Sequence, residues 1–273
     1  MLKKYNDESN SNKIIHFLHG NSFTPCTYKR ILDDFSNNFL IKISLLRPLW
    51  DSNPMPELKN WDIFLNDYIK SIENENNIIG IGHSIGGNLL LKSSILKPEK
   101  FKKIILLDPT FLLPYMIRIW KIIALFNMQS FFLPLINLAK NKRMEYPSID
   151  EMYHSYRKNK IFSNFSDINL KEFVESLLFK EGDQFKLIYP SNWDSQIYKV
   201  GLANDMFIWE NIKNIEVETL IIRAEYSNVF FKKTADLVLK KNKNIKIKVL
   251  SKADHLFPIN RPSETIGLIK KFI

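Results

Sequence analysis

Cysteine is nearly absent from this 273-residue sequence, which contains only Cys26 and can therefore form no disulfide within the chain. The sequence also lacks an apolar run in residues 1–13, where a secretory signal would need one. Both observations favour a reducing environment. We therefore expect a cytoplasmic protein in which Cys26 is an ordinary small side chain.

No apolar run is long and uninterrupted enough to predict a transmembrane helix. The most apolar stretch, residues 104–139, is broken by Asp108, Arg118 and Lys121 and by three prolines. Such a stretch is typical of a buried or surface-lying amphipathic segment. Attachment to a membrane surface would require a helix with two distinct sides over residues 112–126.

A stripe of basic residues is missing as well. The 39 lysines and arginines exceed the 29 aspartates and glutamates, which gives a net charge of +10. These cations are spread along the chain and stand mostly alone among asparagine, isoleucine and glutamate. The charge reflects a general compositional bias, and we expect no nucleic-acid partner.

What the sequence does contain is enough apolar material for a large core, with 45% hydrophobic and 13% aromatic residues. Short apolar runs alternate with segments of helical length and periodicity, a pattern that predicts an α/β fold with a doubly wound, mostly parallel sheet. The predicted strands are residues 14–18, 39–45, 78–82, 104–107, 220–222 and 245–250. The predicted helices are residues 28–35, 61–72, 86–96, 230–240 and 262–272.

A long, mainly helical segment rich in aromatic residues separates the fourth predicted strand from the fifth. We interpret residues 111–214 as an inserted cap, with residues 1–110 and 215–273 forming the two parts of one core domain. The pair Gly182-Asp183 predicts a turn inside this cap.

The clearest chemical motif is GHSIGG at residues 82–87, between a predicted strand and a predicted helix. This is the G-x-S-x-G pattern of a nucleophile elbow in its strand-turn-helix context. A serine on so tight a turn can present its hydroxyl only if the positions two before and two after it carry no side chain. Gly82 and Gly86 meet that need, and Ser84 is the predicted nucleophile.

A histidine in the loop after the last predicted strand is placed to act as the base. His255 lies between that strand and the C-terminal helix, and it follows Ser84 in the chain order expected of such a pair. His16 and His154 are interpreted as packing or surface residues, and His83 as a support for the elbow.

Together these motifs resemble the α/β-hydrolase superfamily over nearly the whole chain apart from the cap. The matching segments, in order, are HGN at 19–21, GHSIGG at 82–87, LLDP at 106–109, LIIRAEYSNVF at 220–230 and ADHLFP at 253–258. The resemblance implies a serine hydrolase that needs no metal or organic cofactor. It also implies an oxyanion hole formed by the backbone N–H groups of Asn21 and Ile85. His19 is expected to shape the HGN loop.

The acid of the triad is where the sequence departs from the superfamily pattern. Most relatives carry an aspartate at the position of Asn228, and an amide cannot supply the charge that stabilises an imidazolium. Asp108 follows the next strand, a position that some members, including certain haloalkane dehalogenases, use for their acid, and it is our first choice. Glu225 is a second candidate, Asn228 is a neutral substitute, and Asp254 is poorly placed.

The predicted function is hydrolysis of an ester or related acyl bond in a small, hydrophobic substrate through an acyl-enzyme. The same residues also fit cleavage of a carbon–carbon bond, acyl transfer, or a catalytically weak ligand-binding protein, and the sequence leaves the oligomeric state open. Aromatic cap residues would supply the apolar pocket walls, namely Phe111, Tyr115, Trp120, Phe126, Phe131, Phe132, Trp193 and Trp209.

Overall fold

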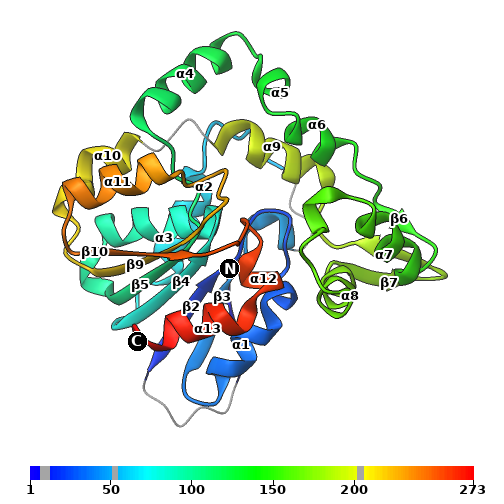
Figure 1. Ribbon diagram of the computed structural model, residues 1–273, viewed down its shortest axis with the longest axis horizontal. Helices are drawn as coiled ribbons and strands as arrows, with labels where there is room; N and C mark the ends of the chain where they lie inside the picture. Colours follow the sequence, from blue (N-terminus) through cyan, green and yellow to red (C-terminus); the bar gives the residue numbers. More distant parts are fainter. Residues whose placement is uncertain (7–12, 51–54, 202–205) are drawn as a thin grey trace.

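The computed structural model describes residues 1–6, 13–50, 55–201 and 206–273, and its centre is a twisted sheet (Figure 1). Seven strands pair in the order β1-β3-β2-β4-β5-β9-β10. Six of them run parallel, and the edge strand β1 is antiparallel to β3. The strands are β1 (Leu2–Lys4), β2 (Ile14–Leu18), β3 (Leu40–Ser44), β4 (Ile78–His83), β5 (Phe101–Leu107), β9 (Glu218–Ala224) and β10 (Ile245–Leu250).

This arrangement confirms the predicted fold class, and each of the six predicted strands is found. The central strands are buried on both faces, which explains their continuous apolar sequence. In β5, Ile104 and Leu106 join the core on one side of the sheet, whereas Ile105 and Leu107 join the core on the other side. Helices must therefore cover both faces.

Two groups of helices supply that cover (Figure 1). The first core includes side chains of α2 (Asp62–Ser71), α3 (Ile85–Leu96), α10 (Met206–Asn211) and α11 (Lys232–Lys241). The second includes side chains of α1 (Lys29–Ser36), α8 (Asp167–Ser176), α12 (Phe257–Asn260) and α13 (Pro262–Lys270). The helix predicted over 86–96 is α3, which is buried along nearly its whole length.

The connection from β5 to β9 carries most of the remaining helices, as the sequence predicts. They are α4 (Pro114–Leu125), α5 (Gln129–Phe132), α6 (Leu135–Lys140), α7 (Ile149–Arg157) and α9 (Ser191–Gly201). A small antiparallel sheet in the order β6-β8-β7 was not predicted; its strands are β6 (Glu145–Tyr146), β7 (Leu178–Glu181) and β8 (Gln184–Leu187). Gly182, with φ 60°, turns the chain between β7 and β8, as predicted. The limits 111–214 of the cap stay a prediction.

Within the described residues, no helix combines the length and the apolar character that crossing a bilayer demands.

Candidate active site

Ser84 occupies a strained turn between β4 and α3. Its φ of 56° and ψ of −119° lie where non-glycine residues are rarely found. The two glycines around it allow this turn, because a Cβ on Gly82 would lie 2.5 Å from the carbonyl oxygen of Gly86. A Cβ on Gly86 would lie 2.2 Å from the carbonyl oxygen of Leu18. The steric reason inferred from the sequence therefore holds in the structure.

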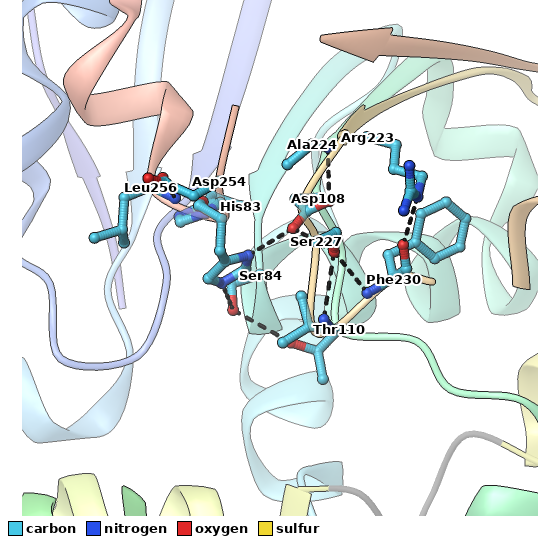
Figure 2. Close-up of polar contacts among 12 residues, drawn as sticks. His83, Ser84, Asp108, Thr110, Arg223, Ala224, Ser227, Phe230, Asp254 and Leu256 are labelled. Carbon is cyan, nitrogen blue, oxygen red and sulfur yellow. Dashed lines mark hydrogen bonds and ion pairs between the residues drawn. The ribbon is translucent and has the colours of Figure 1, made fainter. Parts of the chain in front are cut away.

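Hydrogen bonds bring Ser84, His255 and Asp108 together from three separate loops. Figure 2 shows Ser84 and Asp108 among these polar contacts. The His255 Nε2 atom lies 3.1 Å from Ser84 Oγ, and His255 Nδ1 lies 2.8 Å from Asp108 Oδ2. Because a carboxylate only accepts, Nδ1–H donates to Asp108, which leaves Nε2 of the neutral ring free to accept from the serine hydroxyl. The three side chains thus have the geometry of a nucleophile, a base and the acid that orients the base.

Asp108 is fully buried, yet its carboxylate has hydrogen-bond donors on both oxygens. The Ala224 N–H donates to Oδ1 at 3.0 Å, and the Ser227 hydroxyl donates to Oδ2 at 2.8 Å (Figure 2). With His255, these contacts compensate the loss of water around the carboxylate and fix its direction. Ser227 belongs to the loop after β9. This loop therefore holds the Asp108 carboxylate in place but does not itself supply the carboxylate that meets His255.

The other acid candidates lie elsewhere. Asn228 and Glu225 are exposed, and the Glu225 carboxylate accepts a hydrogen bond from the Lys252 N–H. Asp254 accepts from the N–H of Leu256 and so caps a turn of the chain. The structure brings none of the three into hydrogen-bond contact with His255 within the described residues, whereas Asp108 makes that contact.

The two predicted oxyanion donors lie on neighbouring segments. Ile85 is the first residue of α3, where a backbone N–H has no partner within the helix. The HGN loop packs against the same turn, since the Leu18 and His19 carbonyls contact Gly86. Asn21 in this loop is buried, and its amide is held by Asp194 and by the hydroxyl of Tyr189. The role of the two N–H groups stays a prediction.

His19 is buried and hydrogen-bonded to the backbone, as expected of a residue that shapes the HGN loop. Its Nε2 accepts from the Leu46 N–H at 3.1 Å, so Nδ1 carries the proton and donates to the Gly20 carbonyl at 2.8 Å. Burial lowers the pKa of His19 to about 4, which keeps the ring neutral. His16 is buried within β2, and His154 is exposed on α7.

His83 links the HGN loop to the loop of the base. Its Nε2–H donates to the His255 carbonyl at 3.0 Å, so Nδ1 must accept from the Tyr28 hydroxyl at 2.7 Å. Tyr28 in turn accepts from the Gly20 N–H at 3.0 Å. Burial, together with the nearby His255, lowers the pKa of His83 well below its ordinary value. The support role inferred for His83 therefore extends to both loops.

Sequence reasoning missed three polar side chains at the site. Thr110 Oγ1 lies 3.2 Å from Ser84 Oγ, and the Thr110 N–H donates to the Ser84 carbonyl. Ser227 and Tyr28 hold Asp108 and His83 through their hydroxyl groups. Thr110 follows Asp108 by two residues, and this proximity in the chain is the only signal that the sequence offers.

The aromatic residues expected to wall the pocket divide into two groups. Phe111, Trp120, Trp193 and Trp209 are buried, and the Phe111 and Trp209 rings stack at 4.5 Å. The other four project into solvent, with exposed fractions from 52% to 77%, and they are Tyr115, Phe126, Phe131 and Phe132. These four therefore do not pack into the core, and the role of the eight residues as pocket walls stays a prediction.

No protein-family model and no curated protein matches this sequence. Solved structures do match it along almost its full length. An E-2-(acetamidomethylene)succinate hydrolase has a TM-score of 0.79 at 14% identity, with 99% of this chain and 93% of that chain covered. MenH from S. aureus has a TM-score of 0.72 at 18% identity, with 99% and 97% covered. A thioesterase domain from the curacin biosynthetic pathway has a TM-score of 0.73 at 13% identity, with 95% and 91% covered.

The sheet order, the elbow and these similarities define the class of protein: the chain has the α/β-hydrolase fold. The resemblance seen in the motifs is thereby confirmed for the fold. At such low identity the fold is all that the similarity shows, and the activity is argued from the site itself.

Proposed function

We propose that this protein is a serine hydrolase that cleaves an ester or related acyl bond of a small apolar substrate. The observation that carries the proposal is the continuous set of hydrogen bonds from Ser84 through His255 to a buried Asp108. Nucleophile, base and orienting acid are all within hydrogen-bond reach, which is the geometric requirement for covalent catalysis of this kind.

In the proposed reaction, the Ser84 hydroxyl adds to the acyl carbonyl carbon while His255 Nε2 takes its proton. The negative charge that develops on the carbonyl oxygen is received by the N–H groups of Asn21 and Ile85. As the acyl–oxygen bond breaks, His255 returns the proton to the leaving alcohol. Water then adds to the acyl-enzyme with the same help from His255, which releases the carboxylic acid and restores Ser84.

Asp108 acts through His255 in this scheme. Its hydrogen bond to Nδ1 selects the tautomer with a free Nε2, and its charge stabilises the imidazolium that forms during each proton transfer. Thr110 approaches the nucleophile from the other side, and its hydroxyl can donate to Ser84 Oγ when the serine proton points toward His255. The nucleophile is therefore held between two side chains.

Hydrolysis of a series of p-nitrophenyl esters with increasing acyl length tests this proposal. The wild-type protein should release p-nitrophenol, and the dependence of kcat/KM on acyl length reports how apolar the acyl site is. Ser84→Ala should lower kcat/KM by at least about 10³-fold, because without the serine hydroxyl only binding and the oxyanion donors contribute.

The matched control for this test is Ser263→Ala, which removes the hydroxyl of an exposed serine on α13 and should leave the rate unchanged. Product analysis with an added alcohol separates hydrolysis from acyl transfer, since transfer would yield a new ester in place of the acid. Undiminished turnover by Ser84→Ala, or a folded wild type that cleaves no ester in the series, would contradict the proposal.

A further inference from the structure

Helix α4 has apolar residues on two opposite sides. On one side, Ile117 and Trp120 are buried against the rest of the protein. The other side has apolar residues at intervals of four, three and four positions, which places them on a single stripe, and all of them are exposed. The stripe consists of Tyr115, Ile119, Ile122 and Phe126. A stripe of this kind has no packing role within the protein and is typical of a surface that meets a partner.

The exposed stripe is part of a larger apolar surface. Seventeen large hydrophobic side chains are exposed in the described residues, and nine of them fall within residues 115–138. Helices α4, α5 and α6 follow one another along the outer side of the molecule, away from the central sheet (Figure 1). We define the cap surface as these nine residues: Tyr115, Ile119, Ile122, Leu125, Phe126, Met128, Phe131, Phe132 and Leu138. Concentrations of apolar side chains on one face mark sites of interaction.

The charged residues within the segment that carries the cap surface are all of one sign. Residues 109–144 contain no aspartate or glutamate, but they contain five basic residues. Arg118 and Lys121 are exposed on α4 beside the apolar stripe, and Lys140 and Arg143 are exposed near the end of α6. Two of the five are already paired, Lys142 with Asp194 and Arg143 with Glu151. Arg118, Lys121 and Lys140 are the exposed cations that remain for a partner. The partner of this surface must therefore combine an apolar interior with negative charge.

We propose that the cap surface docks onto the surface of an anionic lipid bilayer. The apolar side chains would enter the boundary between headgroups and acyl chains, while the basic residues meet the lipid phosphates. A second copy of this chain fits less well, because a two-fold contact through the same surface would bring like charges together around an apolar centre. Membrane attachment was expected to need a helix with two distinct sides over residues 112–126, and α4 (Pro114–Leu125) has one buried side and one exposed side there.

This docking is independent of the hydrolase proposal, because the exposed stripe lies on the side of α4 opposite Ile117 and Trp120. The test is co-sedimentation of the intact protein with vesicles of phosphatidylcholine mixed with phosphatidylglycerol, alongside vesicles of phosphatidylcholine alone. The wild type should bind the mixed vesicles more strongly, and added salt should weaken that binding. Ile122→Asp should lower the partition coefficient by about tenfold or more, because a carboxylate then faces the acyl region.

Ile168→Asp is the matched control, because Ile168 is equally an exposed isoleucine but lies on α8, outside the cap surface. It should bind mixed vesicles as the wild type does. Lys121→Glu should weaken binding to mixed vesicles and leave weak binding to neutral vesicles unchanged. Circular dichroism melts of each variant establish that it is folded.

Two results would overturn the proposal. One is a folded wild type that does not bind the mixed vesicles, or that binds them as well after Ile122→Asp. The other is a wild type that sediments as a dimer and that Ile122→Asp converts to a monomer without any vesicle binding, since the occupant of the cap surface would then be a second copy. Neither result bears on ester hydrolysis, which the Ser84→Ala comparison measures separately.

Discussion

At the scale of single residues, three hydrogen-bond donors hold the Asp108 carboxylate against His255, although Asn228 stands where the resemblance to α/β-hydrolases predicts an aspartate. The Ala224 N–H, at the end of β9, and the Ser227 hydroxyl, in the loop that follows, donate to a carboxylate that lies directly after β5. The segment after β5 and the segment after β9 therefore meet beside His255, and the segment after β5 carries the negative charge. Asn228 is exposed, and among the described residues the Nδ1 atom of His255 pairs with Asp108 instead.

Two single substitutions, one that removes the charge at Asp108 and one that adds a charge at Asn228, test the assignment of Asp108 as the acid. Asp108→Asn should lower kcat for a p-nitrophenyl ester by about 10³- to 10⁴-fold, because an amide can hold the wrong tautomer of His255 and cannot stabilise the imidazolium. Asn228→Asp should leave kcat within about twofold, because its side chain is exposed and does not contact His255. A large gain of activity in Asn228→Asp, or full activity in Asp108→Asn, would refute this assignment.

The sequence was sufficient to select Ser84 and His255 as a candidate pair, and the structure brings the two side chains together. A glycine-flanked serine between a strand and a helix, followed by a histidine after the last strand, is a specific pattern. The sequence could only rank Asp108 first among alternatives, since the choice depends on which loop reaches His255 in space. The roles of Thr110 and Ser227 could not be predicted from the sequence. A threonine or serine near a strand end is common in any protein, and only the 3.2 Å and 2.8 Å contacts distinguish these two.

At the scale of elements, the junction of β4, α3 and the HGN loop depends on direct backbone contact. Gly86→Ala would place a methyl group against the Leu18 carbonyl, which cannot move without displacing the loop of Asn21. We expect this change to lower the free energy of unfolding by about 2 kcal/mol or more and to abolish ester hydrolysis. Denaturant unfolding and the ester assay measure the two effects.

Gly267→Ala is the control for that change. Gly267 lies within α13, and nothing approaches the position of its Cβ within 4 Å. The substitution should raise the free energy of unfolding by about 0.5–1 kcal/mol through helix propensity and leave activity unaltered. Equal behaviour of the two alanine variants would mean that the close contact at Gly86 is not needed.

The strands and helices of the core were predictable from their apolar patterns. A central strand is apolar on both faces, and a core helix carries one apolar stripe. The missed elements lack such a signal. β6 has two residues, and β7 is mostly exposed, so neither shows an apolar alternation long enough to recognise. β1 has only three residues, and it adds to the sheet edge through backbone hydrogen bonds that the sequence does not reveal.

At the scale of the whole molecule, buried neutral histidines make stability depend on pH. Burial lowers the pKa of His16 to about 3 and of His19 to about 4, whereas both would titrate near 6.5 in the unfolded chain. Below pH 6.5 the unfolded state therefore takes up protons that the folded state does not, and stability falls. At pH 5 each such histidine should cost about 2 kcal/mol relative to pH 7.

Urea unfolding at a series of pH values between 7 and 5 measures this loss. His19→Gln should reduce the slope of unfolding free energy against pH by about one proton, since the glutamine does not titrate. The control is His154→Gln, which replaces an exposed histidine and should leave the slope as in the wild type. A wild-type stability that rises as the pH falls from 7 to 5 would contradict the neutral state of these rings.

The central claim is that Ser84 is a nucleophile activated by His255 and Asp108. The most direct measurement is reaction of the intact protein with a fluorophosphonate probe, followed by mass spectrometry of the digested protein to locate the adduct. We predict one adduct on Ser84, no adduct in Ser84→Ala, and much slower labelling of Asp108→Asn. Absence of any adduct on the folded wild type, or an adduct on a residue other than Ser84, would contradict the claim.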